Sequence, residues 1–111
     1  MLRLIHNETY CQGFLIGAGC RWETFVNRLT SLGCDLTDDK EPEVGTNGRC
    51  YEFKEGQIAV WVREAPATPE ATAILVHELY HAVRYALDRR GVADEEAQAY
   101  LLQELVRRAL K

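Results

Sequence analysis

The residues between Thr68 and Gly91 predict one long amphipathic helix, which constrains the fold more than any other part of the chain. Thr68, Pro69 and Glu70 form a typical helix start. They supply a capping hydroxyl, a proline whose missing N–H is not needed in the first turn, and an acid near the positive end of the helix dipole. An apolar arc follows along one side of the helix, formed by Ala71, Leu75, Leu79, Ala82, Val83 and Ala86. Because such an arc must be covered, we expect the helix to pack on a sheet.

The rest of the chain divides into short strand-like runs and two further helices. The expected elements are, in order, strands at 2–6 and 10–16, a helix at 22–32, strands at 49–54 and 57–64, the long helix, and a third helix after Asp94. The strand at 57–64 is apolar on both faces, so we expect it to be covered on both sides. The order β, β, α, β, β, α, α predicts a single α+β domain over residues 1–111.

The charge balance argues against a nucleic-acid partner. The chain has 17 acidic and 13 basic side chains, and much of the acidic excess lies in residues 35–43. Binding dominated by phosphate contacts needs a basic face instead. A membrane is not expected either, because the longest nearly uncharged apolar run, residues 11–20, is far short of the roughly 20 residues that a membrane span needs.

The cysteines and the start of the chain favour a cytoplasmic protein. Residues 1–10 lack the charged segment and the long apolar segment of an export signal. The four cysteines at positions 11, 20, 34 and 50 form no CxxC pair, so they are not typical of a zinc knuckle or a thioredoxin-type motif. We therefore expect reduced thiols that pack in the fold.

The polar side of the long helix carries the sequence HELYH at residues 77–81. Residues four apart on a helix differ by about 40° around the axis and by about 6 Å along it, so His77 and His81 can direct their imidazoles at one metal ion. Glu78 is turned by about 100° from His77, which puts its carboxylate beside the ion, where it can take a proton from water. One helix would thus supply two ligands and a base.

A third ligand is needed, because zinc in a hydrolase usually has three protein ligands and one position for water. His6 is the only other histidine, and it lies on the expected N-terminal strand. Glu95 and Glu96 are better candidates, because a short turn at Gly91 brings the next helix back alongside the first. Both glutamates lie at the start of that helix.

These motifs together resemble the gluzincin metallopeptidases, in which HExxH on one helix is completed by a glutamate on the next, often within an ExxA pattern. Residues 96–99 read EAQA, which implies Glu96 as the third ligand. Glu96 also shares a helix face with more polar residues than Glu95 does, although Glu95 remains an alternative. Residues 57–107 look especially like small predicted peptidases encoded by bacteriophages.

The resemblance implies a small zincin-like domain, with a short mixed or antiparallel sheet and an edge strand before the HExxH helix. It also implies a zinc-dependent peptidase in the cytoplasm, here the bacterial host cytoplasm of a phage protein. Zinc would polarise the scissile carbonyl and lower the pKa of its water, and Glu78 would move the proton to the leaving amine. The peptide or protein substrate would lie extended along the strand at 57–64.

The group that stabilises the oxyanion is less defined, because no histidine follows His81 in the chain. Tyr100 is the first candidate for an oxyanion or substrate contact, with Tyr85, Arg84 and Arg107 as alternatives. The main rival function is a noncatalytic zinc-containing module that uses the same helix pair and an exposed strand to hold a protein partner. Replacing Glu78 by glutamine would separate the two functions.

Overall fold

The computed structural model describes residues 1–111 and contains one four-stranded sheet and three helices. Its elements are β1 (Leu2–Asn7), β2 (Gln12–Ala18), α1 (Trp22–Ser31), β3 (Gly48–Glu52), β4 (Ile58–Val62), α2 (Pro69–Asp88) and α3 (Glu95–Ala109). The predicted order of elements and the α+β class are thus confirmed. The predicted cap of α2 is also present, because the Ala71 N–H donates to Thr68 Oγ1 at 3.1 Å.

The strand order is β1-β2-β4-β3, with a parallel pair β2–β4 between two antiparallel pairs. This order corrects one prediction: the strand expected at 57–64 is not an edge strand. It forms β4, which pairs with β2 on one side and with β3 on the other, and all its residues are buried. A run that is apolar on both faces suits the interior of a sheet better than its edge. The edge strand beside α2 is β3.

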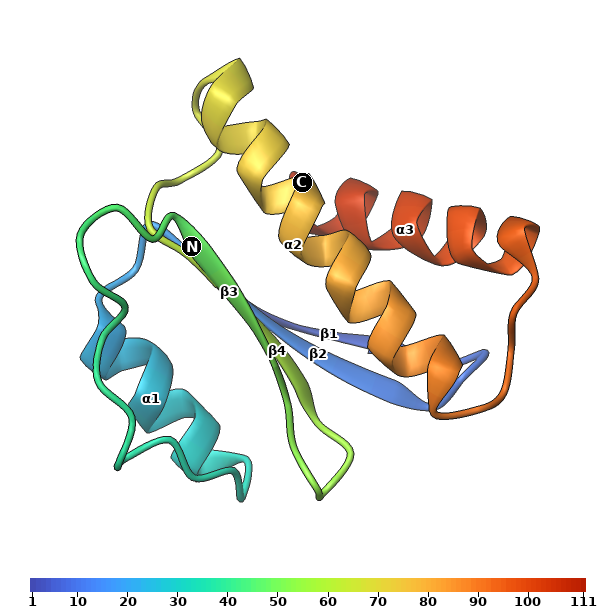
Figure 1. Cartoon of the computed structure of the whole chain (residues 1–111), viewed down its shortest axis with the longest axis horizontal. Helices are drawn as coiled ribbons and strands as arrows, with labels where there is room; N and C mark the ends of the chain where they lie inside the picture. Colours follow the sequence, from blue (N-terminus) through green and yellow to red (C-terminus); the bar gives the residue numbers. More distant parts are fainter.

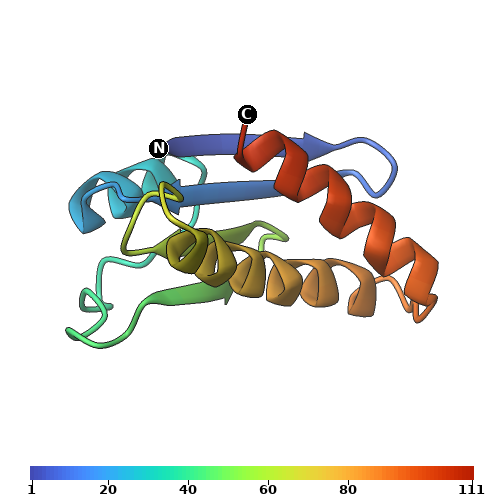
Figure 2. The same ribbon diagram turned by 90° about the horizontal axis from the view of Figure 1, so that it is seen from above.

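The helices cover the two faces of the sheet unequally (Figure 1). On one face, α1 buries an aromatic-rich cluster that includes Trp22, Phe25 and Trp61. On the other face, α2 and α3 bury the larger cluster, which includes Val60, Leu79 and Leu105. The view in Figure 2 shows α2 alongside β3 and β4, and α3 across the side of β1. No helix of the structure combines the length and the apolar character needed to cross a membrane.

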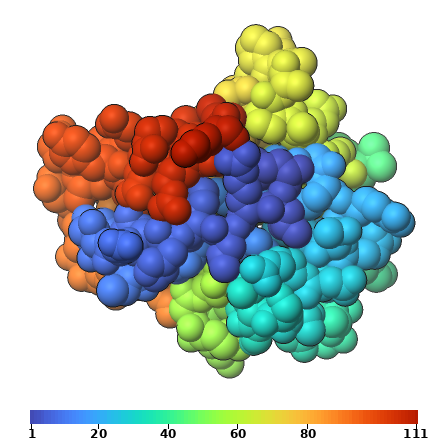
Figure 3. All heavy atoms as spheres, turned by 180° about the vertical axis from the view of Figure 1, so that it is seen from behind, coloured from blue at the N-terminus to red at the C-terminus, as the bar shows by residue number.

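The two edges of the sheet differ in how they are covered. At the β1 edge, Arg108 Nη1 donates to the His6 carbonyl at 2.8 Å, and Asn7 Nδ2 donates to Glu104 Oε2 at 2.7 Å. Figure 3 shows α3 lying against β1 there. At the opposite edge, β3 pairs only with β4. The edge that β3 forms therefore lies beside α2 and pairs with no further strand.

Candidate metal centre and adjoining groove

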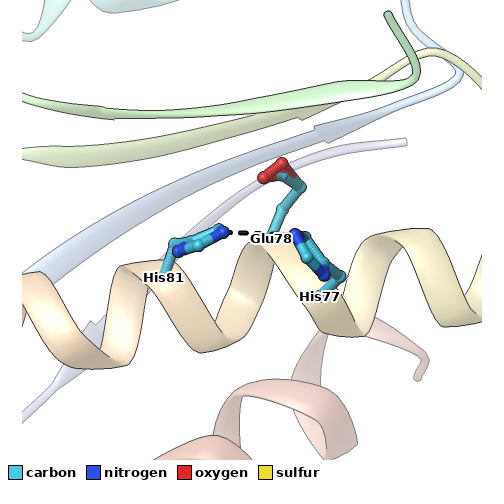
Figure 4. Close-up of side chains that lie close together, drawn as sticks. All are labelled: His77, Glu78 and His81. Carbon is cyan, nitrogen blue, oxygen red and sulfur yellow. Dashed lines mark hydrogen bonds between the residues drawn. The ribbon is translucent and has the colours of Figure 1, made fainter.

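His77 and His81 lie one turn apart on the exposed side of α2, and their imidazoles converge (Figure 4). Their Nε2 atoms are 3.2 Å apart. Two imidazole nitrogens that bind one tetrahedral zinc ion at about 2.0–2.1 Å lie roughly 3.3 Å from each other. The pair is therefore spaced for one metal ion.

Glu78 points from α2 toward the sheet, beside the two imidazoles (Figure 4). Its carboxylate belongs to the same cluster, in which the ligand atoms of the three residues lie within 4.8 Å of one another. The side chain is only 7% exposed, and it takes part in none of the ion pairs or hydrogen bonds of the chain. Its oxygens are not among the fully buried polar atoms that lack a partner, so the carboxylate itself stays open to the groove. A free carboxylate beside two imidazoles is typical of a functional site.

An open groove runs between α2 and β3 and consists of two hollows. The Ile74 hollow is lined by Asn47, Ala73, Ile74 and His77, and the Tyr85 hollow by Arg49, Cys50, Tyr51, His81 and Tyr85. Gly48 and Glu78 line both hollows, so the two adjoin at this point. The carboxylate of Glu78 thus opens into the middle of the groove.

The open edge of β3 presents unpaired backbone groups beside this groove. The Arg63 N–H donates to the Asn47 carbonyl at 2.9 Å, and the Phe53 N–H donates to the Gln57 carbonyl at 3.0 Å. The odd-numbered residues of this segment therefore point their backbone groups toward β4. Because these directions alternate along a strand, the N–H and C=O groups of residues 48, 50 and 52 point away from β4. They are free to pair with another extended chain.

Gly48 allows β3 to lie close to Glu78. A Cβ atom at this position would lie 2.9 Å from Glu78 Cγ and 2.9 Å from Val62 Cγ1, which is too short for a carbon–carbon contact. We expect Gly48→Ala to lower the free energy of unfolding by about 1 to 3 kcal/mol, measured in urea. The loss should be smaller when Glu78 is also alanine, because one of the two close contacts is then absent. Equal losses in both backgrounds would contradict a direct contact.

Two protonated groups line the Tyr85 hollow. Burial and, to a smaller extent, the nearby carboxylates of Glu78 and Glu52 together raise the pKa of Cys50 to about 12. Burial also raises the pKa of Tyr85, with contributions from Cys50 and the same two carboxylates. Near neutral pH, Cys50 is therefore a thiol, and the hydroxyl of Tyr85 is a hydrogen-bond donor.

The predicted third ligands lie outside the cluster of ligand atoms. Glu95 and Glu96 are exposed in the first turn of α3, and neither carboxylate belongs to the cluster around His77. Tyr80 on α2 donates to Gln98 Oε1 at 3.4 Å, so Gln98 marks the face of α3 that is turned to α2. Glu95 shares this face, whereas Glu96 is turned by about 160° from Gln98. Glu95 is thus the better placed of the two, and the identity of the third ligand stays a prediction.

Among the candidates for an oxyanion contact, only Tyr85 lines the groove. Tyr100 is 68% exposed on α3 and lines neither hollow. Arg84 forms an ion pair with Asp88, with 3.7 Å between Nη2 and Oδ2, and Arg107 is exposed on α3. Tyr85 lies one helical turn after His81 in the sequence, and this spacing already made it a candidate for the oxyanion contact.

The sequence patterns did not mark Gly48, Cys50 and Ile74 as groove residues. The first two belong to β3, and they carry no motif that separates them from ordinary strand residues. Only the position of β3 at the edge brings them beside the metal centre. Conversely, His6 lies on β1, the opposite edge strand, which excludes it from the cluster.

Comparisons of the chain with models of protein families, with curated proteins and with solved structures gave no significant match. The chemistry of the site therefore rests on its own geometry. That geometry consists of two imidazoles spaced for one ion, the carboxylate of Glu78 beside them, and a groove along an open sheet edge.

Proposed function

We propose that this chain is a zinc-dependent metallopeptidase in which His77 and His81 hold the metal ion and Glu78 is the general base. The observation that carries the proposal is the 3.2 Å separation of the two Nε2 atoms beside the carboxylate of Glu78, which makes no internal hydrogen bond. When bound, zinc supplies a Lewis acid that polarises a carbonyl and lowers the pKa of water. The third ligand is proposed to come from the first turn of α3, as Glu95 or Glu96.

Glu78 is placed to hold and move a proton in this reaction. Its carboxylate makes no internal hydrogen bond that a proton transfer would have to break. It also opens into both hollows of the groove, so it can reach both sides of a bond that lies over the histidine pair. Such a group can accept a proton from water and pass it to the leaving amine. The hydroxyl of Tyr85 lines the same groove and is the candidate donor to an oxyanion.

The open edge of β3 supports an extended peptide or protein segment as the substrate. The free backbone groups of residues 48, 50 and 52 are complementary to those of an extended chain, and such pairing is a common mode of peptide recognition. The sequence suggested that the substrate pairs with residues 57–64. Because these residues form the central strand β4, we propose that the substrate pairs with the neighbouring edge strand β3 instead. The resemblance to small phage-encoded peptidases supports an activity in the cytoplasm of a bacterial host.

Hydrolysis of a mixed pool of unstructured peptides, followed by mass spectrometry, tests this function. We expect the zinc-loaded protein to cleave peptides, to stop when a chelator removes zinc, and to resume when zinc is added back. Cleavage that the chelator does not affect would point to a contaminating peptidase. A zinc-loaded protein that cleaves none of the pool would count against the enzyme.

A noncatalytic zinc-containing module that binds proteins is the second candidate function. One observation favours it: the cluster of ligand atoms holds His77, Glu78 and His81 but no further carboxylate. Such a module would use the open edge of β3 to pair with a partner. It would bind peptides equally well with glutamate or glutamine at position 78, and would cleave none.

A further inference from the structure

The connection between α1 and β3 is held against the sheet on the α1 side (Figure 1). Its anchor is Arg63, just after β4, whose guanidinium lies 5.1 Å from the centre of the Trp61 ring. Trp61 belongs to the cluster that α1 buries. The same guanidinium donates to the carbonyl oxygens of Pro42 at 2.9 Å, Glu43 at 3.1 Å and Thr46 at 3.2 Å. These three hydrogen bonds fix the last part of the connection beside β3.

A further hollow, the loop hollow, lies between this connection and β3. It is lined by Asp39, Lys40, Glu41, Pro42, Glu43, Thr46, Arg49 and Tyr51. The Tyr51 ring packs on Trp22, with 6.2 Å between ring centres, so Tyr51 and Arg49 direct their side chains to the α1 face. Both residues also line the Tyr85 hollow, which lies between β3 and α2. The edge of β3 at residues 49–51 therefore has a hollow on each face of the sheet.

The connection makes the loop hollow acidic. Residues 35–43 read DLTDDKEPE, with five acidic side chains and one basic side chain. Three of the acids, Asp39, Glu41 and Glu43, line the hollow. All three are exposed, and none of them takes part in an ion pair of the chain. Their charges are therefore available to a bound ligand.

Tyr51 shows that the acidic side chains act at the strand itself. Burial is the main cause that raises the pKa of Tyr51 to about 12, while the Arg49 guanidinium lowers it and the Asp39 carboxylate raises it. The carboxylate thus lies within electrostatic reach of the edge strand. The half-buried ring of Tyr51 can also support the methylene stem of a long side chain whose charged end reaches the carboxylates.

A peptide paired with β3 would direct its side chains to both faces of the sheet. Side chains alternate along an extended chain, so every second one would point to the α1 side. Beside residues 49–51, these side chains would meet the loop hollow. Its carboxylates attract a lysine or arginine side chain and repel an acidic one. Arg49 opposes this preference, because it places a positive charge at the same edge.

We infer that the edge of β3 binds extended peptide segments that carry lysine or arginine on the face turned to the loop hollow. This inference rests on the proposed pairing of the substrate with β3, but it does not require hydrolysis. It names the substrate class as basic segments. Asp39 favours such a segment and Arg49 limits the preference, and neither residue belongs to the metal centre.

Fluorescence anisotropy with three labelled peptides tests the inference. The peptides alternate threonine with lysine, glutamine or glutamate, so one face of each extended peptide carries the side chains under test. A chelator keeps the protein free of zinc, so no peptide is cleaved by a zinc-dependent reaction. We expect the lysine peptide to have a Kd about tenfold lower than the glutamate peptide, and this difference to shrink at high salt. The glutamine peptide should lie between the two.

Three variants separate the loop hollow from the charge of the whole chain, which is −4. Asp39→Asn should reduce the preference for lysine over glutamate by about threefold, and Arg49→Gln should increase it by about as much. Glu8→Gln is the matched control for Asp39→Asn. It also removes one negative charge from an exposed side chain, but it lies in the turn between β1 and β2 and lines no hollow of the β3 edge. It should leave the preference unchanged.

The inference would be overturned by equal Kd values for the three peptides, by a preference for glutamate, or by binding of none of them. An equal effect of Glu8→Gln and Asp39→Asn would overturn it too, because the preference would then come from net charge. Hydrolysis of the mixed peptide pool without a preference for basic residues would leave the peptidase standing and refute this inference. Selective binding of the lysine peptide by a protein that hydrolyses nothing would refute the peptidase and leave this inference standing.

Discussion

His77→Ala is expected to weaken zinc binding by more than about 100-fold, because the two imidazoles of α2 act as one chelating pair. Their Nε2 atoms already lie 3.2 Å apart, so little reorganisation is needed to bind an ion. Zinc content can be measured by elemental mass spectrometry on protein purified without added metal. Affinity can be measured by competition with a chelating dye. His81→Ala should have the same effect.

His6→Ala is the matched control for this experiment, because His6 is exposed on β1 at the other edge of the sheet. It should leave zinc binding unchanged. Glu95→Gln and Glu96→Gln, made separately, identify the third ligand, and the true ligand is the one whose loss lowers the affinity. If the wild type stays free of zinc after zinc is offered, the metal centre does not exist and the peptidase proposal fails with it.

Glu78→Gln is expected to lower the rate of hydrolysis by about 10²- to 10⁴-fold while zinc stays bound. Glutamine keeps the shape of the side chain but cannot accept a proton at the reacting bond. The same change should leave the free energy of unfolding of the zinc-free protein nearly unchanged, because the carboxylate has no internal partner and opens into the groove. Peptide cleavage and urea denaturation measure the two effects on one preparation.

The two effects of Glu78→Gln discriminate between the candidate functions. A lower rate together with an unchanged stability is the pattern of a group that acts in the reaction and not in holding the fold. Unchanged peptide binding without cleavage in either form would instead support the noncatalytic module. A less stable zinc-free variant would show that the carboxylate stabilises the fold, which contradicts its lack of internal partners.

Local patterns were sufficient to predict the elements of this fold. The hydroxyl of Thr68, the proline after it and the apolar arc of α2 each act within a few residues, so they can be read from the sequence. The convergence of His77 and His81 is equally local, because the helix itself sets their spacing. This part of the metal centre was therefore predictable before any tertiary structure was known.

The order of strands in the sheet was not predictable in the same way. It depends on which strands pair across long stretches of sequence, as β2 and β4 do on either side of α1. The apolar faces of residues 57–64 pointed to a central strand, but the resemblance to peptidases placed that strand at the edge. The groove residues Gly48 and Cys50 and the position of α3 relative to His77 depend on the same long-range packing.

The open edge of β3 also has a consequence for association between copies of the chain. Unpaired strand edges can join two sheets, and proteins limit this with short strands and charged side chains. The strand β3 is five residues long, starts with a glycine, and carries the exposed residues Arg49 and Glu52. A single extended peptide can follow so short an edge, whereas a second rigid sheet would gain few hydrogen bonds from it. The edge is thus suited to transient pairing with flexible segments more than to lasting pairing between folded copies.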